Sequence, residues 1–375
     1  RPTGGREENL PATTNRPEWT LCAFDGARLV ASYAAIPFTM RANGRAMAMA
    51  GVTIVGTLPE YRRQGLLRRF TERSFADMRE RDQTVAALWA SQAAIYQRYG
   101  YSMCSVLRRY EIDTVDANLL EPADPDYRVS RTTPEESFAT LKDLYRQFVS
   151  QRMLYLHRSA TLWQANALAD KEADGPVHVA ICRDADDTPV GYVIYTLREG
   201  RVDHPARAQE IIVRDLVWQN IEAYRALWAF LAKHDLVGRI LWSNAPGDDP
   251  AGEVFSEPRM LRARDQEGAY LRIVDVPGAL AGRGYDSDGE ITLGVQPDRE
   301  APWNEGTWQL CVSGGEAQIN AVSKPAEVAF NIKALSSAFS GHQRVSRLAA
   351  WGLVTGSEDA IRRADAIFAT RHAPH

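Results

Sequence analysis

One transition limits the fold of this chain more than any other feature: a strand that passes through an arginine- and glycine-containing turn into a helix. An apolar, β-rich run over Ala46–Thr57 meets Pro59, and the pattern predicts a helix over Phe70–Arg81. Residues 62–67 place backbone N–H groups at a helix N-terminus, where the macrodipole and nearby arginines attract a diphosphate. Gly65 lets the backbone approach the phosphates closely. Because short glycine-containing loops are weak signals, an ordinary strand–turn–helix with a surface arginine cluster is the alternative.

A second segment, residues 88–101, runs from an apolar strand into a short helix that carries Tyr96 and ends at Tyr99-Gly100-Tyr101. Together the two segments resemble the GNAT acetyltransferases. In that family the first loop holds the diphosphate of coenzyme A, and the later tyrosine protonates the departing thiolate. The family pattern Arg/Gln-x-x-Gly-x-Gly/Ala is matched by Arg62-x-x-Gly65-x-Leu67. Leu67 departs from it but still offers an N–H group.

Within the GNAT enzymes, residues 62–68 and 90–101 look like the corresponding segments of the Eis (enhanced intracellular survival) family, and the likeness extends over most of the chain. It implies an α/β (α+β) protein with tandem GNAT folds, each a mixed, mostly antiparallel sheet with flanking helices, followed by a sterol-carrier-protein-like domain. It also implies acetyl-CoA as co-substrate and direct transfer to polyamine-like molecules, aminoglycosides or lysine amines. A cytoplasmic homohexamer is the assembly that the resemblance implies.

The length predicts two or three domains, because 375 residues exceed the size at which one core keeps growing. The order of patterns and the resemblance divide the chain into residues 1–122, 123–264 and 265–375. Residues 1–17 are expected to form a loose polar arm. Three strands follow, with Asp25-Gly26 and Asn43-Gly44 between them as tight hairpin turns. Leu107–Ile112 is expected to close the first domain.

The middle domain is predicted to be a degenerate copy of the first, with Asp215–Asn220 in the place of the phosphate turn. This stretch has no glycine and no arginine cluster after the strand, so we expect no coenzyme A there. In the last domain, Gly306–Val312 alternates polar and apolar residues as a half-buried strand does. An antiparallel sheet with helices on one face suits the sterol-carrier-like interpretation.

The composition of the chain limits the classes of partner that it can bind. A net charge of -4 argues against nucleic acid, and no charge-free stretch reaches the length of about 18 residues that spans a membrane. No signal peptide is visible. Four widely spaced cysteines predict neither a disulfide framework nor a metal site, and a reducing cytosol fits them.

Acyl transfer to an amine needs a polarised carbonyl, a proton for the thiolate and a base for the amine. The end of the strand Gly51–Thr57 is expected to polarise the carbonyl through its N–H groups and, if it splays from its neighbour, to pair with the pantetheine arm. The residues expected to bind the cofactor are Val55, Gly56, Thr57, Arg63, Gln64, Gly65, Leu66, Leu67, Arg68 and Ser91.

Tyr96 is the predicted acid, because a phenol near pKa 10 and a thiol near 8.5 differ by only about 2 kcal/mol. A core aromatic is its alternative role. Ser91 either bonds the cofactor or a water near the thioester, or caps a helix. Trp89 either walls an amine pocket through cation–π contact or packs in the core.

The base is harder to assign, because Ala46–Thr57 contains no Asp, Glu or His. The Eis resemblance implies the C-terminal carboxylate, which here belongs to His375, although the family's aromatic terminal residue is absent. Two rival hypotheses stay open. One is a coenzyme A-binding module without catalysis, and the other is a lipid carrier built around the last domain.

Overall fold

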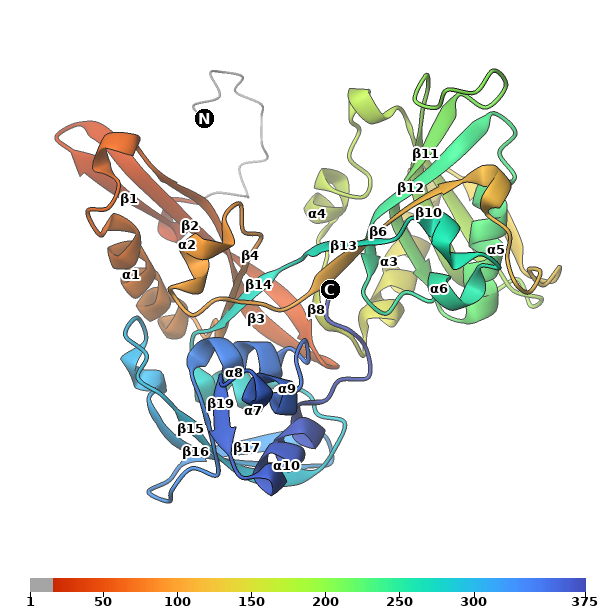
Figure 1. Ribbon diagram of the computed structural model, residues 1–375. Helices are drawn as coiled ribbons and strands as arrows, with labels where there is room; N and C mark the ends of the chain where they lie inside the picture. The colour runs from red at the N-terminus through yellow and green to blue at the C-terminus, as the bar shows by residue number, and fades with distance from the viewer. Residues whose placement is uncertain (1–15) are drawn as a thin grey trace. The chain divides into compact units, whose positions relative to one another are not determined.

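The computed structural model describes residues 16–375, which divide into two compact units (Figure 1). The first unit joins the described residues up to Cys104 with Ala269–Thr370. The second unit joins Ser105–Gly268 with Arg371–His375. The loose arm predicted for residues 1–17 lies outside the described range except for its last two residues.

The main sheet of the first unit has the strand order β1-β2-β3-β4-β14-β5. The strands β1 to β3 form the predicted antiparallel meander, and β3 then pairs with β4 in parallel. The turns adopt the left-handed conformation expected of Asn-Gly and Asp-Gly, with φ of 58° at Gly26 and 50° at Asn43. The elements are β1 (Thr20–Asp25), β2 (Arg28–Ala42), β3 (Arg45–Thr57), α1 (Leu66–Glu80), β4 (Val85–Leu88), α2 (Ala93–Gln97), β5 (Ser102–Met103) and β14 (Tyr270–Ile273).

Helix α1 packs on this sheet because its apolar residues recur on one face. Phe75 and Met78 are buried against Tyr33, Ala50 and Ala86 from three different strands. The helix begins at Leu66, four residues before the predicted start, since Gly65 occupies the N-cap position. The phosphate turn is therefore shorter than the sequence pattern predicts.

The first unit also contains a second, smaller sheet with the order β17-β16-β15-β18-β19. Helix α10 packs on β15 and β18, and α9 packs on β19. No helix within residues 16–375 has the length and apolar character needed to cross a membrane. The elements are α7 (Val276–Gly282), β15 (Gly289–Val295), β16 (Gly306–Ser313), β17 (Glu316–Ala321), β18 (Val328–Phe330), α8 (Ile332–Phe339), α9 (Val345–Ala350), β19 (Val354–Gly356) and α10 (Glu358–Phe368).

The second unit is built on one sheet with the order β13-β6-β12-β11-β10-β9-β7. The expectation that Leu107–Ile112 closes the first domain is wrong, because β6 pairs with β12 and β13 in this sheet. The elements are β6 (Val106–Asp113), β7 (Arg128–Thr132), α3 (Pro134–Val149), β8 (Met153–Leu156), α4 (Ala160–Ala165), β9 (Val177–Arg183), β10 (Pro189–Arg198), β11 (Gln209–Trp218), α5 (Ile221–Ala232), β12 (Val237–Pro246), α6 (Ala251–Val254) and β13 (Arg264–Glu267).

Successive residues of β10 serve two cores, one on each face of this sheet. Tyr192 and Ile194 pack with α3, whereas Val193 and Tyr195 pack with α5. This follows from the period of two in a strand, which sends neighbouring side chains to opposite faces. The near-continuous apolar run of β10 is therefore the signature of a strand covered on both sides.

A buried carboxyl group lies at the edge of the α5 core. Asp249 is 7% exposed, and Tyr224 and the amide of Ala251 donate hydrogen bonds of 2.8 and 3.0 Å to its Oδ1 atom. Burial raises the pKa of Asp249 to about 6, although these hydrogen bonds act in the opposite direction. The folded protein therefore holds this proton more tightly than the unfolded chain, whose Asp has a pKa near 3.9.

We expect this carboxyl to weaken the fold as the pH rises. Its contribution to stability is complete below about pH 4 and is lost as the pH passes through about 6. Between pH 5 and 7 the free energy of unfolding of Asp249→Asn should increase relative to the original protein by about 1 kcal/mol. Denaturant unfolding followed by tryptophan fluorescence measures this difference.

The exposed Asp203→Asn serves as the matched control for the replacement of a surface carboxyl group. Subtracting the original protein from the variant also removes the opposite contribution of His375, whose pKa burial lowers to about 4. A difference that does not change with pH would contradict the assignment.

Candidate active site

The pairing between the parallel strands β3 and β4 covers only part of β3. Their pairing covers Met49, Ala50 and Gly51 of β3 and stops there, while β3 continues to Thr57. A bulge follows, in which Ile54 has a φ of 50° and its carbonyl accepts a 2.8 Å hydrogen bond from Ser32 Oγ. The edge of β3 beyond Gly51 is therefore not paired with β4, as the predicted pantetheine contact requires.

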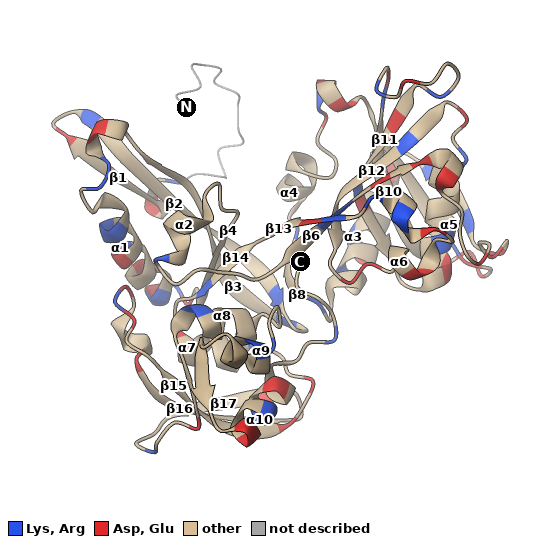
Figure 2. Ribbon diagram, viewed as in Figure 1, with Lys and Arg blue, Asp and Glu red and all other residues tan. Residues whose placement is uncertain are grey.

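Helix α1 begins with an open N-terminus. Gly65 is the N-cap residue with a φ of 80°, and no side chain caps this end of the helix. The first N–H groups of a helix have no partner within it, so they remain available to an acceptor. Arg63 also lies in the left-handed region, with a φ of 63°. Basic residues lie along α1 from its first turn (Figure 2).

A cavity of about 1160 Å³ joins the open strand edge, the helix N-terminus and the segment that carries Tyr96. Nine of the ten residues expected to bind the cofactor line it, together with Tyr96. These nine residues are Val55, Gly56, Thr57, Arg63, Gly65, Leu66, Leu67, Arg68 and Ser91.

Three predicted residues do not line this cavity. Gln64 turns back to donate a 3.3 Å hydrogen bond to the carbonyl of Glu60. Trp89 is 67% exposed, so it is not a core residue. His375 belongs to the second unit, where its ring stacks on Tyr155 at 4.8 Å and its amide donates to the carbonyl of Met153 at 3.2 Å.

Tyr96 lies in the short helix α2 and is partly buried. Its ring meets that of Tyr101 edge-on at 6.1 Å, and burial raises the pKa of its phenol. The competing tyrosines differ: Tyr101 is 2% exposed and does not line the cavity, whereas Tyr99 lines it but is 7% exposed. Tyr96 is thus the most accessible phenol of this segment.

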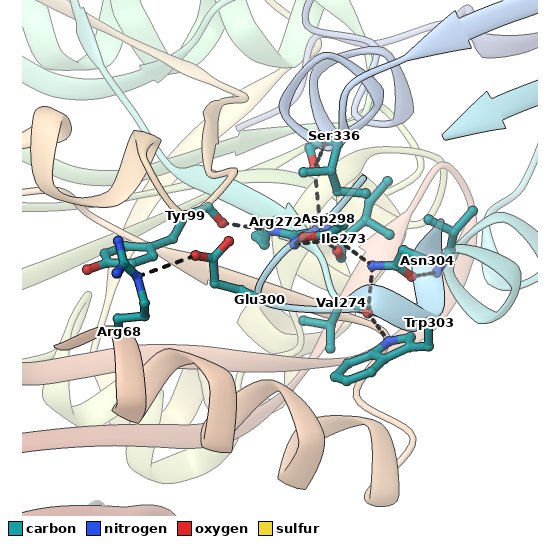
Figure 3. A network of polar contacts seen from close by, with 12 residues as sticks. Arg68, Tyr99, Arg272, Ile273, Val274, Asp298, Glu300, Trp303, Asn304 and Ser336 are labelled. Carbon is teal, nitrogen blue, oxygen red and sulfur yellow. Dashed lines mark hydrogen bonds and ion pairs between the residues drawn. The ribbon is translucent and has the colours of Figure 1, made fainter. Parts of the chain in front are cut away.

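The charges of the cavity lining are all positive within the described residues. Arg62, Arg63, Arg68 and Arg98 line it, without any Asp, Glu or His. Just outside the lining, Glu300 lies 3.9 Å from Arg68 (Figure 3). No three His, Cys, Asp or Glu side chains of residues 16–375 converge to hold a metal ion. The electrostatics favour an anionic ligand.

Coenzyme A, with its diphosphate, fits this arrangement. An uncapped helix N-terminus flanked by arginines is an anion site, and the unpaired edge of β3 can accept an extended amide-containing arm. A cavity of about 1160 Å³ exceeds the size usual for a drug-sized ligand.

The second unit has the same arrangement of strand, turn and helix, but side chains occupy the place of the cavity. Strand β11 pairs with β12 only as far as Val213, but the cavity beyond measures about 20 Å³. Arg158 occupies the region and forms an ion pair with Asp215. The side chain of Asn220 caps α5 by accepting a 2.9 Å hydrogen bond from Ala223, where α1 has an open glycine.

Comparison with known proteins agrees with this arrangement of domains. Models of the acetyltransferase (GNAT) domain match residues 3–104 and 154–273, and a sterol carrier protein domain model matches residues 276–375. An uncharacterized N-acetyltransferase of Streptomyces coelicolor is 30% identical over 83% of this chain and 76% of its own. N-acetyltransferase Eis of Mycobacterium tuberculosis is 30% identical over 86% of this chain and 78% of its own. The chain belongs to the Eis family of GNAT N-acetyltransferases.

The solved structures include Eis1 from Mycobacterium abscessus, which is 29% identical with a TM-score of 0.80 and covers 95% of this chain and 88% of its own. The tandem GNAT folds and the sterol-carrier-like domain predicted from sequence are confirmed. As a GNAT enzyme, this Eis-family protein uses acetyl-CoA.

Sequence reasoning missed the wall of the cavity that comes from β2, which contributes residues 29–32. The register of the β2–β3 hairpin places Ala31 opposite Thr57 and Ser32 opposite Gly56. The Asn43-Gly44 turn was a usable signal, because turn geometry sets the register of a hairpin. The bulge at Ile54, however, shifts that register and has no signal in the sequence.

Proposed function

We propose that the first GNAT domain of this Eis-family protein transfers acetyl directly from acetyl-CoA to a primary amine of a polyamine-like substrate. Aminoglycosides and lysine-type amines are the candidate acceptors. One observation carries the proposal: an uncapped helix N-terminus, an unpaired strand edge and the phenol of Tyr96 line one cavity.

Backbone groups would hold the cofactor in two places. Residues 63–68, with the guanidinium groups of Arg63 and Arg68, would hold the diphosphate. Val55 and Thr57 would pair with the pantetheine arm and polarise the acetyl carbonyl through backbone N–H groups. Acetyl-CoA supplies the acetyl group as an activated thioester.

Tyr96 would hold the proton that the thiolate needs. Burial raises the pKa of its phenol, so Tyr96 stays protonated at the pH at which amines react. Proton transfer from an unperturbed phenol to a thiolate costs about 2 kcal/mol, and the raised pKa adds to this. Ser91, which lines the same cavity, would hydrogen-bond the cofactor or a water molecule.

The acceptor amine must lose a proton before it attacks. At pH 7 this costs about 4.6 kcal/mol for an alkyl ammonium with a pKa near 10.4. Since the described lining of the cavity has no carboxylate, the base must be a group outside that lining. We keep Trp89 as a wall for the amine, because its exposed ring is free to cover a cation. A cytoplasmic homohexamer remains our expectation for the assembly.

An acceptor panel tests the proposal. Thiol release from acetyl-CoA should occur with polyamines, aminoglycosides and lysine peptides, and rates should exceed those for simple monoamines. The rate should rise with pH until the amine is deprotonated, because only the free base attacks. Fully N-methylated versions of the same amines are the matched controls, since they retain the charge but cannot accept acetyl.

Two outcomes would contradict the proposal. Coenzyme A binding without turnover of any amine would favour the binding module. An apolar ligand that co-purifies with the protein, in the absence of coenzyme A binding, would favour the lipid carrier.

A further inference from the structure

A buried polar network in the first unit surrounds Arg272, which strand β14 places between β4 and β5 (Figure 3). Arg272 is 0% exposed, and its Nη2 atom donates to both carboxylate oxygens of Asp298 at 2.5 and 2.6 Å. Its Nη1 group donates to the carbonyl of Ile273. Asn304 adds a 2.9 Å hydrogen bond to Asp298. The charge of Asp298, from the sterol-carrier-like domain, is thus fully coordinated.

The third guanidinium nitrogen of Arg272, Nε, contacts the segment that carries Tyr96. Its Nε group donates a 2.9 Å hydrogen bond to the carbonyl of Tyr99, and the amide of Tyr99 donates at 2.9 Å to the carbonyl of Tyr96. Two hydrogen bonds therefore lead from the guanidinium to the backbone of Tyr96.

Two further contacts hold the same turn. Gly100 has a φ of 81°, and a Cβ atom there would lie 2.7 Å from Arg272 Nε and 2.7 Å from Ile332 Cγ2. Lys333, the next residue of α8, donates a 2.6 Å hydrogen bond from Nζ to Gln97 Oε1. The turn after α2 is thus pressed between β14 and α8.

Helix α2 cannot fix its own direction. It has only five residues and no side-chain cap, and a helix this short is not stable without tertiary contacts. A buried ion pair seldom stabilises a fold more than apolar residues of the same volume would. The contacts that the Arg272–Asp298 pair makes with this turn therefore point to a role in setting geometry.

We propose that Arg272, Asp298 and Lys333 are positioning residues that set the direction of Tyr96, so that the sterol-carrier-like domain braces the acid of the first GNAT domain. The inference rests on the proposed function, in which Tyr96 is the acid. It gives the last domain a part in the reaction without any contact with substrate.

The test combines kinetics with hydrogen exchange in four single variants and one double variant. Lys333→Met removes the contact with Gln97 from a partly exposed position, and Arg272→Lys keeps the charge but loses the forked guanidinium. Each should lower kcat by about tenfold or more, because a misplacement near 1 Å can cost about a hundredfold. KM for acetyl-CoA should change less than twofold. In the ligand-free protein, amide exchange should accelerate over residues 93–101.

The decisive comparison uses Tyr96→Phe as the background. If the brace acts through Tyr96, Lys333→Met should cause no further loss of kcat in that variant. The exposed Lys324→Met, in the same domain, is the matched control and should change neither kcat nor exchange.

Two results would overturn the inference while Tyr96→Phe remains defective. One is unchanged exchange over residues 93–101 in Lys333→Met. The other is an equal loss of kcat from Lys333→Met with and without the phenol. A fully active Tyr96→Phe would instead remove the acid role itself, and the exchange data would still report whether the turn is braced. Because Lys333→Met leaves the buried ion pair intact, the test survives if Arg272→Lys fails to fold.

Discussion

Tyr96→Phe is expected to lower kcat by about a hundredfold or more, the lower end of what general acid catalysis contributes. The variant keeps the ring that meets Tyr101 and loses only the hydroxyl group. The thiolate must then leave without a proton from the protein. KM for acetyl-CoA should change little, because the cradle at α1 is untouched. Steady-state kinetics of thiol release measures both constants.

The dependence of kcat on pH gives a second test of Tyr96 as the acid. Since burial raises the pKa of Tyr96 above 10, its loss of the proton should not reduce kcat below pH 10 in the original enzyme. Tyr99→Phe is the matched control, because Tyr99 lines the same cavity but is more deeply buried. An equal loss in both variants, or none in Tyr96→Phe, would refute the assignment of the acid.

Gly65→Asp is expected to weaken coenzyme A binding by about a hundredfold, or about 2.7 kcal/mol. The new carboxylate would lie at the helix N-terminus, where it repels a diphosphate and competes for the same N–H groups. The fold should survive, since a Cβ atom at Gly65 meets nothing within 4 Å. Calorimetric titration with coenzyme A measures the change, which should shrink at high salt.

Two controls separate charge from backbone strain. Gly65→Asn tolerates the left-handed φ comparatively well and adds no charge, so its effect should be smaller. Gly26→Asp places the same carboxylate in an open hairpin turn with a φ of 58° and should leave binding unchanged. If Gly65→Asp altered the Kd of coenzyme A less than threefold, the cradle would lie elsewhere.

Local patterns predicted the elements of this fold well. The three strands expected around Asp25-Gly26 and Asn43-Gly44 are β1, β2 and β3, and the strand expected over Gly306–Val312 is β16. Partners of strands were harder to predict. Leu107–Ile112 was expected to complete the first domain, yet it pairs with β12 and β13. Periodicity shows that a segment is a strand but carries no information about which distant strand it joins.

The residues of the candidate site likewise differ in how well the sequence predicts them. The turn around Gly65 and the proposed acid Tyr96 lie in continuous motifs, so the sequence could predict that both belong to the site. Gln64 faces Glu60 because a side chain's direction in a left-handed turn depends on neighbouring φ values. The contacts around Arg272 could not be predicted from the sequence. Asp298 contacts Arg272, and Lys333 contacts α2, only through tertiary packing.

The placement of β14 also determines when this enzyme can fold. This strand lies between β4 and β5 in the first sheet, although Ser105–Gly268 of the second unit come before it in the sequence. During synthesis on the ribosome, the first sheet therefore stays incomplete. Its strand β4 keeps an unpaired edge until the middle of the protein and then β14 have emerged. The middle domain can complete nearly all of its own sheet in that time. Synthesis thus supplies every strand of the second sheet before the first sheet can be completed.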